Sequence, residues 1–243
     1  MFETLQGLYA ASLVPIITIG WPLCTLDFVI LTFNLTCVYL VGRNNIANYP
    51  IGLVGITAYM FMCFSLGFYS EFFLQIYLFI ASLIGWYMWR NRGSHTLQPR
   101  VMPKISYLLI VLVWAGSTII LGSNIDKFFM EFVNFIEPLL TLINSGTPVE
   151  YVHSPASYPY YDALTTTGQI LAMILMVRKY VESWVLWIIV NAISVPLFIM
   201  KGGYGIAIMF AIFFILAVMG LIKWINLINQ QRKPKSPISD LHS

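Results

Sequence analysis

Apolar residues fill long runs of this chain, and short polar segments separate the runs. Seven runs approach or reach the roughly 20 residues that a helix needs to cross a bilayer. They lie at about 24–42, 50–68, 71–89, 105–122, 163–177, 183–200 and 204–226. The fifth run is short, but its Thr and Gly residues suit a helix that packs inside a bundle. The pattern therefore predicts an all-α membrane protein with seven transmembrane helices.

Two further apolar segments are not expected to cross the bilayer. The first, residues 1–23, is interrupted by Pro15 and Pro22, and we expect an interfacial segment or an additional packed helix there. The second, residues 128–144, contains Glu131 and Glu137, whose insertion into hydrocarbon is costly. We expect this second segment to form an interfacial amphipathic helix.

The composition agrees with a bilayer as the solvent of the chain. Of the 243 residues, 59% are hydrophobic and 9% are charged, against about 25% charged residues in a soluble domain. The mean hydropathy is +0.80. These values exclude a water-soluble domain and a disordered chain, and the net charge of +3 gives no sign of nucleic-acid binding.

Basic residues gather on one side of the predicted topology. Of the 13 Lys and Arg residues, only Lys127 and Lys201 fall on the opposite side, where most of the acidic residues lie. Cytoplasmic loops of membrane proteins are enriched in Lys and Arg. We therefore expect the N-terminus outside and the tail, residues 229–243, in the cytoplasm.

The two halves of the sequence match when Asp27 is aligned with Asp162, a displacement that we call the repeat shift. Without any gap it also pairs Thr32/Thr167, Arg43/Arg178, Gly67/Gly202, Tyr69/Tyr204, Phe79/Phe214 and Gly85/Gly220, and Asn34 aligns with Gln169. We expect two parallel three-helix bundles, 24–92 and 163–228, joined through a linker span within 93–162. Parallel repeats of this kind form transporters with a site between the halves, although a duplication can also serve only to stabilise a bundle.

The sixth span carries the most informative candidate site. Trp184, Trp187 and Asn191 follow an i, i+3, i+7 spacing and share one helical face. Two indoles and an amide on one face would bind a flat polar ring. Trp184 alone would also suit an aromatic belt at the membrane surface, whereas Asn191 lies about two turns into the hydrocarbon and needs a polar partner.

Further polar or aromatic groups lie on faces of other spans. They are Gln75, Ser82 and Trp86 on the third span, Thr166 and Gln169 on the fifth, and Asn34 on the first. Each would hydrogen-bond either a ligand or a neighbouring helix. All the acidic residues near spans fall at the predicted ends, so we expect an uncharged cleft and downhill transport.

Other classes of activity lack their motifs. The sequence contains no GxxxxGK[ST] loop for ATP and no HExxH or GxSxG motif of a hydrolase. The three Cys and three His residues do not have metal-ligand spacing. We therefore expect no enzyme activity, no cofactor and no metal; a receptor that binds without transporting stays open as an alternative.

Three runs of this sequence are distinctive: LMVRKYVESWVLWIIVNAISVPLFIMKGGY at 175–204, GWYMW at 85–89 and NYPIGLVGITAYMF at 48–61. They closely resemble parts of the PnuC family of bacterial vitamin transporters. The resemblance extends over most of the chain, and its most specific element is the WxxWxxxN pattern at Trp184, Trp187 and Asn191.

The resemblance implies a fold and a function. It implies a SWEET-like arrangement of two three-helix bundles with a linker helix, assembled as a homotrimer in the bacterial inner membrane. It implies facilitated diffusion of nicotinamide riboside, which a cytoplasmic kinase traps by phosphorylation. Thiamine or riboflavin, which related proteins carry, is the alternative substrate. Asn191 would then bond the carboxamide of the riboside, and Gln75, Gln169 or Thr166 its ribose.

Overall fold

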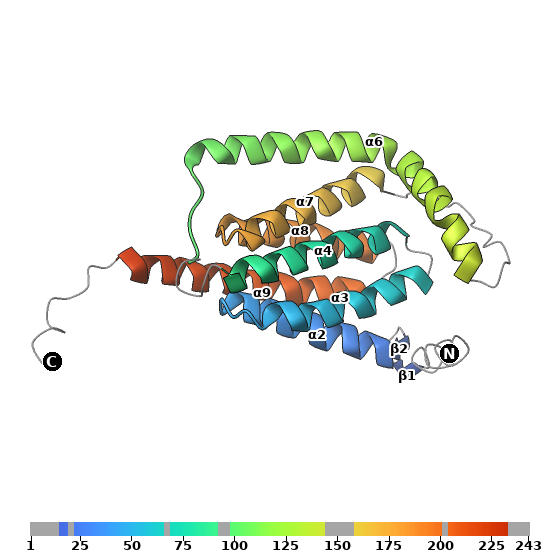
Figure 1. Ribbon diagram of the computed structural model, residues 1–243, viewed down its shortest axis with the longest axis horizontal. Helices are drawn as coiled ribbons and strands as arrows, with labels where there is room; N and C mark the ends of the chain where they lie inside the picture. Colours follow the sequence, from blue (N-terminus) through green and yellow to red (C-terminus); the bar gives the residue numbers. More distant parts are fainter. Residues whose placement is uncertain are drawn as a thin grey trace, which may run out of the picture.

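The computed structural model describes residues 15–18, 22–65, 69–91, 98–143, 158–200 and 204–232. Seven long helices lie in these ranges (Figure 1). They are α2 (Thr25–Gly42), α3 (Asn48–Ser65), α4 (Tyr69–Asn91), α6 (Lys104–Ile143), α7 (Pro159–Val177), α8 (Glu182–Met200) and α9 (Tyr204–Arg232). Except for α6, each helix coincides with one predicted span to within six residues at either end. The all-α prediction is confirmed for the part of the chain that carries these helices.

Most of these helices have the length and composition of membrane spans. Among the described residues, five stretches qualify by length and hydropathy alone, in α2, α4, α8, α9 and the first part of α6. The other two helices, α3 and α7, have 18 and 19 residues. Both are long enough to cross the hydrocarbon at about 1.5 Å per residue, and both lie alongside the longer spans (Figure 1).

Six of the helices form a closed ring. Within each bundle, α3 packs against α2 and α4, and α8 packs against α7 and α9. The bundles meet where α2 contacts α9 and where α4 contacts α7. We call the end of the ring that carries Arg43, Arg90 and Arg178 the basic end, and the opposite end, with Asp27 and Asp162, the acidic end.

The linker helix α6 lies outside the ring and packs on α7 (Figure 1). The indole N–H of Trp114 donates to the carbonyl of Leu164 at 3.0 Å, and the hydroxyls of Thr118 and Thr167 lie 3.0 Å apart. The opposite face of α6 is apolar and exposed, with Ile105 at 78%. Such a surface suits contact with hydrocarbon or with another membrane helix.

Helix α6 is longer than predicted. Its 40 residues extend over about 60 Å, about twice the hydrocarbon thickness, and its C-terminal part turns away from the axis of the first part (Figure 1). The prediction of a separate interfacial helix at 128–144 is therefore wrong in its N-terminal boundary. The segment is helical up to Ile143, but it continues the linker span without a break.

The expectation of a helix near the N-terminus is wrong for the residues that can be compared. Pro15–Thr18 forms strand β1 and Pro22–Cys24 forms strand β2, and the two pair antiparallel. Proline has no backbone N–H and disrupts a helix interior, whereas it is tolerated at the first position of a strand. Both strands begin with proline for this reason, and residues 1–14 lie outside the described ranges.

The structure shows the internal repeat in its backbone as well as in its sequence. Helices α3 and α4 begin at Asn48 and Tyr69, and α8 and α9 begin at Glu182 and Tyr204, so the repeat shift relates both pairs to within one residue. The turns before α3 and α8 also match. Among the described non-glycine residues, only Asn44 (54°), before α3, and Lys179 (58°), before α8, have a positive φ. The repeat shift aligns these two residues.

Each bundle packs an aromatic ring against a glycine at its basic end. A Cβ on Gly85 would lie 2.6 Å from the ring of Tyr49, and a Cβ on Gly220 would lie 2.6 Å from the ring of Trp184. The repeat shift relates these two contacts, ring to ring and glycine to glycine. Glycine is required at both positions because a side chain would occupy the space of the ring.

We expect Gly220→Ala to destabilise the fold. The added methyl group would displace the fully packed indole of Trp184, and overpacking of this kind costs about 1–3 kcal/mol. Thermal unfolding in detergent should therefore show a midpoint lower by several degrees. Gly116→Ala is the matched control, because no heavy atom lies within 4 Å of its added Cβ. Equal midpoints for the two variants would contradict the packing described here.

Candidate functional site, a cavity between the two bundles

A cavity of about 180 Å³ lies inside the six-helix ring. All six ring helices contribute to its wall, whereas no described residue of α6 does. One buried water needs about 10–15 Å³ of such space, so the cavity has room for a small organic molecule. Its position between two parallel repeats is the position at which transporters of this plan bind their substrates.

Seven of the nine residues predicted for the site lie in the wall of this cavity. They are Asn34, Gln75, Ser82, Gln169, Trp184, Trp187 and Asn191. The other two, Thr166 and Trp86, do not line it. Thr166 is partly buried on α7, and Trp86 packs against the apolar cluster at the basic end that contains Trp89 and Trp184.

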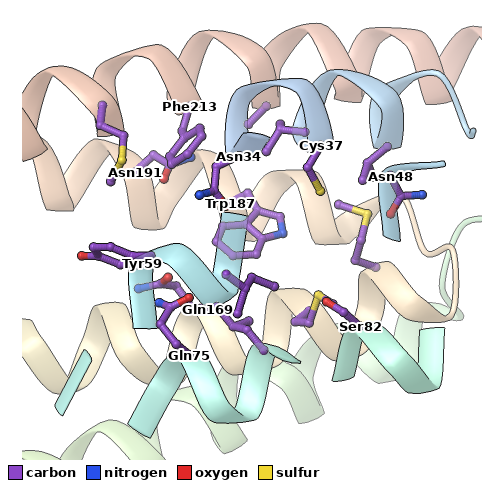
Figure 2. Close-up of a pocket in the computed structure, with 18 of the residues that line it drawn as sticks. Asn34, Cys37, Asn48, Tyr59, Gln75, Ser82, Gln169, Trp187, Asn191 and Phe213 are labelled. Carbon is purple, nitrogen blue, oxygen red and sulfur yellow. The ribbon is translucent and has the colours of Figure 1, made fainter. Parts of the chain in front are cut away.

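Trp187 and Asn191 form the centre of the site on α8. Figure 2 shows the indole of Trp187 in the middle of the cavity, with Asn34 on one side and Gln75 and Gln169 on the other. Asn191 is 2% exposed, and its Oδ1 has no hydrogen-bond partner among the described residues. An unsatisfied buried acceptor costs about 1–3 kcal/mol. A ligand that donates a hydrogen bond to Asn191 would remove this cost.

Trp184 has a different place from Trp187. Its side chain is 1% exposed, and its ring meets that of Trp224 edge to face with centroids 5.6 Å apart. It also occupies the space that Gly220 leaves. Trp184 therefore closes the cavity at the basic end and stabilises the bundle, and the partly exposed Trp187 is the indole with a face available to a ligand.

The two bundles supply amides to the cavity from different helices. Asn34 on α2 donates from Nδ2 to the carbonyl of Ile30 at 2.8 Å, and Gly55 makes room for it, because a Cβ there would lie 2.8 Å from Nδ2. Gln75 on α4 and Gln169 on α7 extend from neighbouring helices of opposite bundles (Figure 2). Ligand hydroxyls in this region would have both donors and acceptors within the wall.

Several residues of the wall were missed by the sequence reasoning. They include Cys37, Asn48, Tyr59, Glu71, Trp89 and Phe213. A helical spacing could have found three of them: Cys37 follows Asn34 at i+3, and Glu71 and Trp89 extend the face of Gln75 and Ser82. The expectation of an uncharged cleft is wrong at Glu71, which adds a carboxylate near the acidic end.

The wall is chemically asymmetric although the backbone is repeated. Among the pairs of repeat-related positions that both line the cavity, three combine a polar residue with an apolar one. These pairs are Gln75/Phe210, Ser82/Ala217 and Asn191/Ile56. The α4 side is therefore polar where the α9 side is apolar, and a ligand with one polar and one flat apolar part has a preferred orientation.

The described residues contain no group of three or more His, Cys, Asp or Glu side chains that could hold a metal ion. The described wall also has no Lys or Arg. Its chemistry is therefore hydrogen bonding through amides and hydroxyls, contact with aromatic faces, and a single carboxylate at Glu71. Such a set of groups can bind a small polar or aromatic molecule.

Comparisons with known proteins agree with this geometry. The family model described as nicotinamide mononucleotide transporter matches residues 25–226. The chain is 30% identical over 218 residues to the nicotinamide riboside transporter PnuC of Escherichia coli (strain K12), with 88% of this chain and 90% of the relative covered. It is 22% identical over 212 residues to the PnuC of Neisseria mucosa, with 81% and 70% covered.

A solved structure has the same fold. The crystal structure of the vitamin B3 transporter PnuC matches 95% of this chain and 89% of its own with a TM-score of 0.62, at 22% sequence identity. The resemblance predicted from the sequence is thereby confirmed. The chain belongs to the nicotinamide mononucleotide transporter family, which includes the PnuC proteins, and it is a multi-pass membrane transporter.

Proposed function

We propose that this protein carries nicotinamide riboside into the bacterial cytoplasm by facilitated diffusion. In this proposal the two bundles rock about the cavity and open it alternately to each side of the inner membrane. A cytoplasmic kinase then phosphorylates the riboside and traps it. The basic end faces the cytoplasm, in keeping with the rule that cytoplasmic loops are rich in Lys and Arg, and the protein assembles as a homotrimer.

The observation that carries the proposal is the buried, unpartnered Oδ1 of Asn191 beside the indole of Trp187. The carboxamide N–H of nicotinamide would donate to that oxygen. The pyridinium ring would lie on the indole, which attracts a cation by about 0.5–2 kcal/mol. The ribose hydroxyls would bond Gln75 and Gln169. Thr166, the other residue considered for the ribose, lies outside the wall.

Charge favours the riboside over its 5′-phosphate. Arginine and lysine are the side chains that recognise phosphate through their charge, and the described wall has neither. The carboxylate of Glu71 would attract the pyridinium cation and repel a phosphate. The matching family model carries the mononucleotide in its description, whereas the PnuC relatives are named for the riboside.

Uptake into liposomes tests the proposal. With the membrane potential held at zero, we expect the purified protein to equilibrate labelled riboside across the membrane and to stop when the two concentrations are equal. Proton or sodium gradients should change neither the rate nor the endpoint, since no acidic side chain lies in the middle of a described span. Binding without flux would instead favour a receptor, and accumulation above equilibrium would show coupling to an ion.

Substitutions within the wall should separate binding from folding. We expect Trp187→Ala and Asn191→Leu each to weaken riboside binding by about tenfold, which corresponds to roughly 1.4 kcal/mol. Isothermal titration in detergent measures the affinity, and size-exclusion chromatography checks the fold. Thr166→Val is the control, because Thr166 is a polar residue outside the wall and valine has a similar size. This variant should bind the riboside as the wild type does. Unchanged affinity in both wall variants would place the substrate elsewhere.

A competition experiment tests the choice of ligand. We expect nicotinamide riboside to bind at least tenfold more tightly than the mononucleotide, because burial of an unpaired phosphate is costly. Thiamine and riboflavin, the alternative substrates, belong in the same titration series. Equal binding of riboside and mononucleotide would contradict the site proposed here, and tighter binding of thiamine or riboflavin would assign the protein to that substrate.

A further inference from the structure

Two buried tryptophans connect the bundles at the basic end. The indole N–H of Trp89 on α4 donates to the carbonyl of Val177 on α7 at 3.0 Å. The indole N–H of Trp224 on α9 donates to the carbonyl of Val41 on α2 at 3.2 Å. The repeat shift aligns Trp89 with Trp224, so the duplication places one such bond on each side of the ring. We call Trp89 and Trp224 the inner tryptophans.

The inner tryptophans also close one end of the cavity. Trp89 meets Tyr49 edge to face with centroids 5.1 Å apart, and Trp224 meets Trp184 in the same way at 5.6 Å. Tyr49, Trp89 and Trp184 belong to the wall of the cavity. Trp224 is 0% exposed and lies behind Trp184. The two aromatic pairs therefore lie at the basic end of the cavity, where a ligand leaving toward that end would meet them.

The two halves of this closure differ in charge. The Nζ atom of Lys179 lies 3.9 Å from the ring centroid of Trp89, a cation–π contact. The position equivalent to Lys179 is Asn44, which is uncharged and whose Oδ1 has no described hydrogen-bond partner. Both residues have a positive φ, which residues other than glycine rarely adopt. The repeat thus keeps the strained turn and places an ammonium group in only one copy.

The surroundings of Lys179 fix its position. Its side chain is 3% exposed, and its carbonyl accepts a hydrogen bond from the backbone N–H of Arg100 at 3.0 Å. The carbonyl of Arg100 in turn accepts from the N–H of Val181 at 2.9 Å. Burial lowers the pKa of the Lys179 ammonium to about 8, which is still above neutral pH.

We propose that Trp89 and Trp224 form the cytoplasmic gate of this transporter and that Lys179 is a positioning residue that holds the Trp89 half closed. The proposal rests on the alternating access proposed above. Opening at the basic end requires the separation of α4 from α7 and of α9 from α2, which breaks both indole hydrogen bonds. The Trp89 half must also lose the contact with Lys179, so this half is the more strongly closed one.

A native cysteine reports whether the gate is open. Cys37 lines the cavity, whereas Cys63 is fully buried. With Cys24 and Cys63 replaced by serine, a charged methanethiosulfonate that cannot cross the membrane reaches Cys37 only through an open end of the cavity. The reagent is applied to either face of oriented vesicles, and the modification rate is measured without any substrate.

We expect Lys179→Met to raise the modification rate of Cys37 from the cytoplasmic face by about fivefold, the factor that corresponds to the loss of a cation–π contact of average strength. The rate from the outer face should not rise. Lys179→Arg keeps the cation and should restore the wild-type rate. Arg178→Met is the matched control, since it removes one charge from the exposed neighbouring residue and touches no described tryptophan.

Three results would overturn the gate. They are an unchanged rate in Lys179→Met, an equal rise from both faces, and the same rise in Arg178→Met. Trp89→Phe is a second, conservative variant that keeps an aromatic ring, and with it the fold, but lacks the N–H donor. It should also raise the modification rate of Cys37 from the cytoplasmic face. Because the measurement needs no ligand, failure of riboside uptake would refute the proposed substrate and leave the result for the gate intact.

Discussion

A polar cavity can exist in the middle of a hydrocarbon layer only if a continuous wall of helices separates it from lipid. Backbone groups in that layer must be hydrogen-bonded within the protein, and an exposed amide on the lipid side would be costly. The ring of α2, α3, α4, α7, α8 and α9 meets this requirement, since each helix contacts its two neighbours and the last contacts the first. The positions of Asn191, Gln75 and Gln169 inside the ring follow from it.

This constraint also explains which parts of the fold could be predicted from the sequence. A span in lipid must be an apolar helix of sufficient length, so the pattern of apolar runs located six helices to within six residues. The repeat supported the same assignment through Asp27 and Asp162, two charged residues that are uncommon near spans. Outside the hydrocarbon the constraint is absent. There α6 continues beyond its span, and Pro15 and Pro22 begin strands instead of interrupting a helix.

The candidate site was predictable to the extent that polar residues are rare inside spans. Seven of the nine predicted residues line the cavity. An amide, hydroxyl or indole within a span avoids the lipid-facing side and therefore lies mostly in the interior of the ring. Thr166 and Trp86 show the limit of this reasoning, since a polar or amphipathic side chain can also be accommodated between two helices. Glu71 was set aside because it lies at the end of a span, but a cavity that extends to that end includes it.

The unequal walls of the cavity have a consequence for how such a protein can arise. Two separate copies of one three-helix unit would present each inward residue twice, and a ligand would meet the same groups on both sides. Once the copies are joined in a single polypeptide, position 75 can hold glutamine while position 210 holds phenylalanine. Fusion of the repeats therefore allows equivalent positions of the two halves to carry different side chains, one for hydrogen bonding and the other for shape, which an association of identical chains cannot achieve.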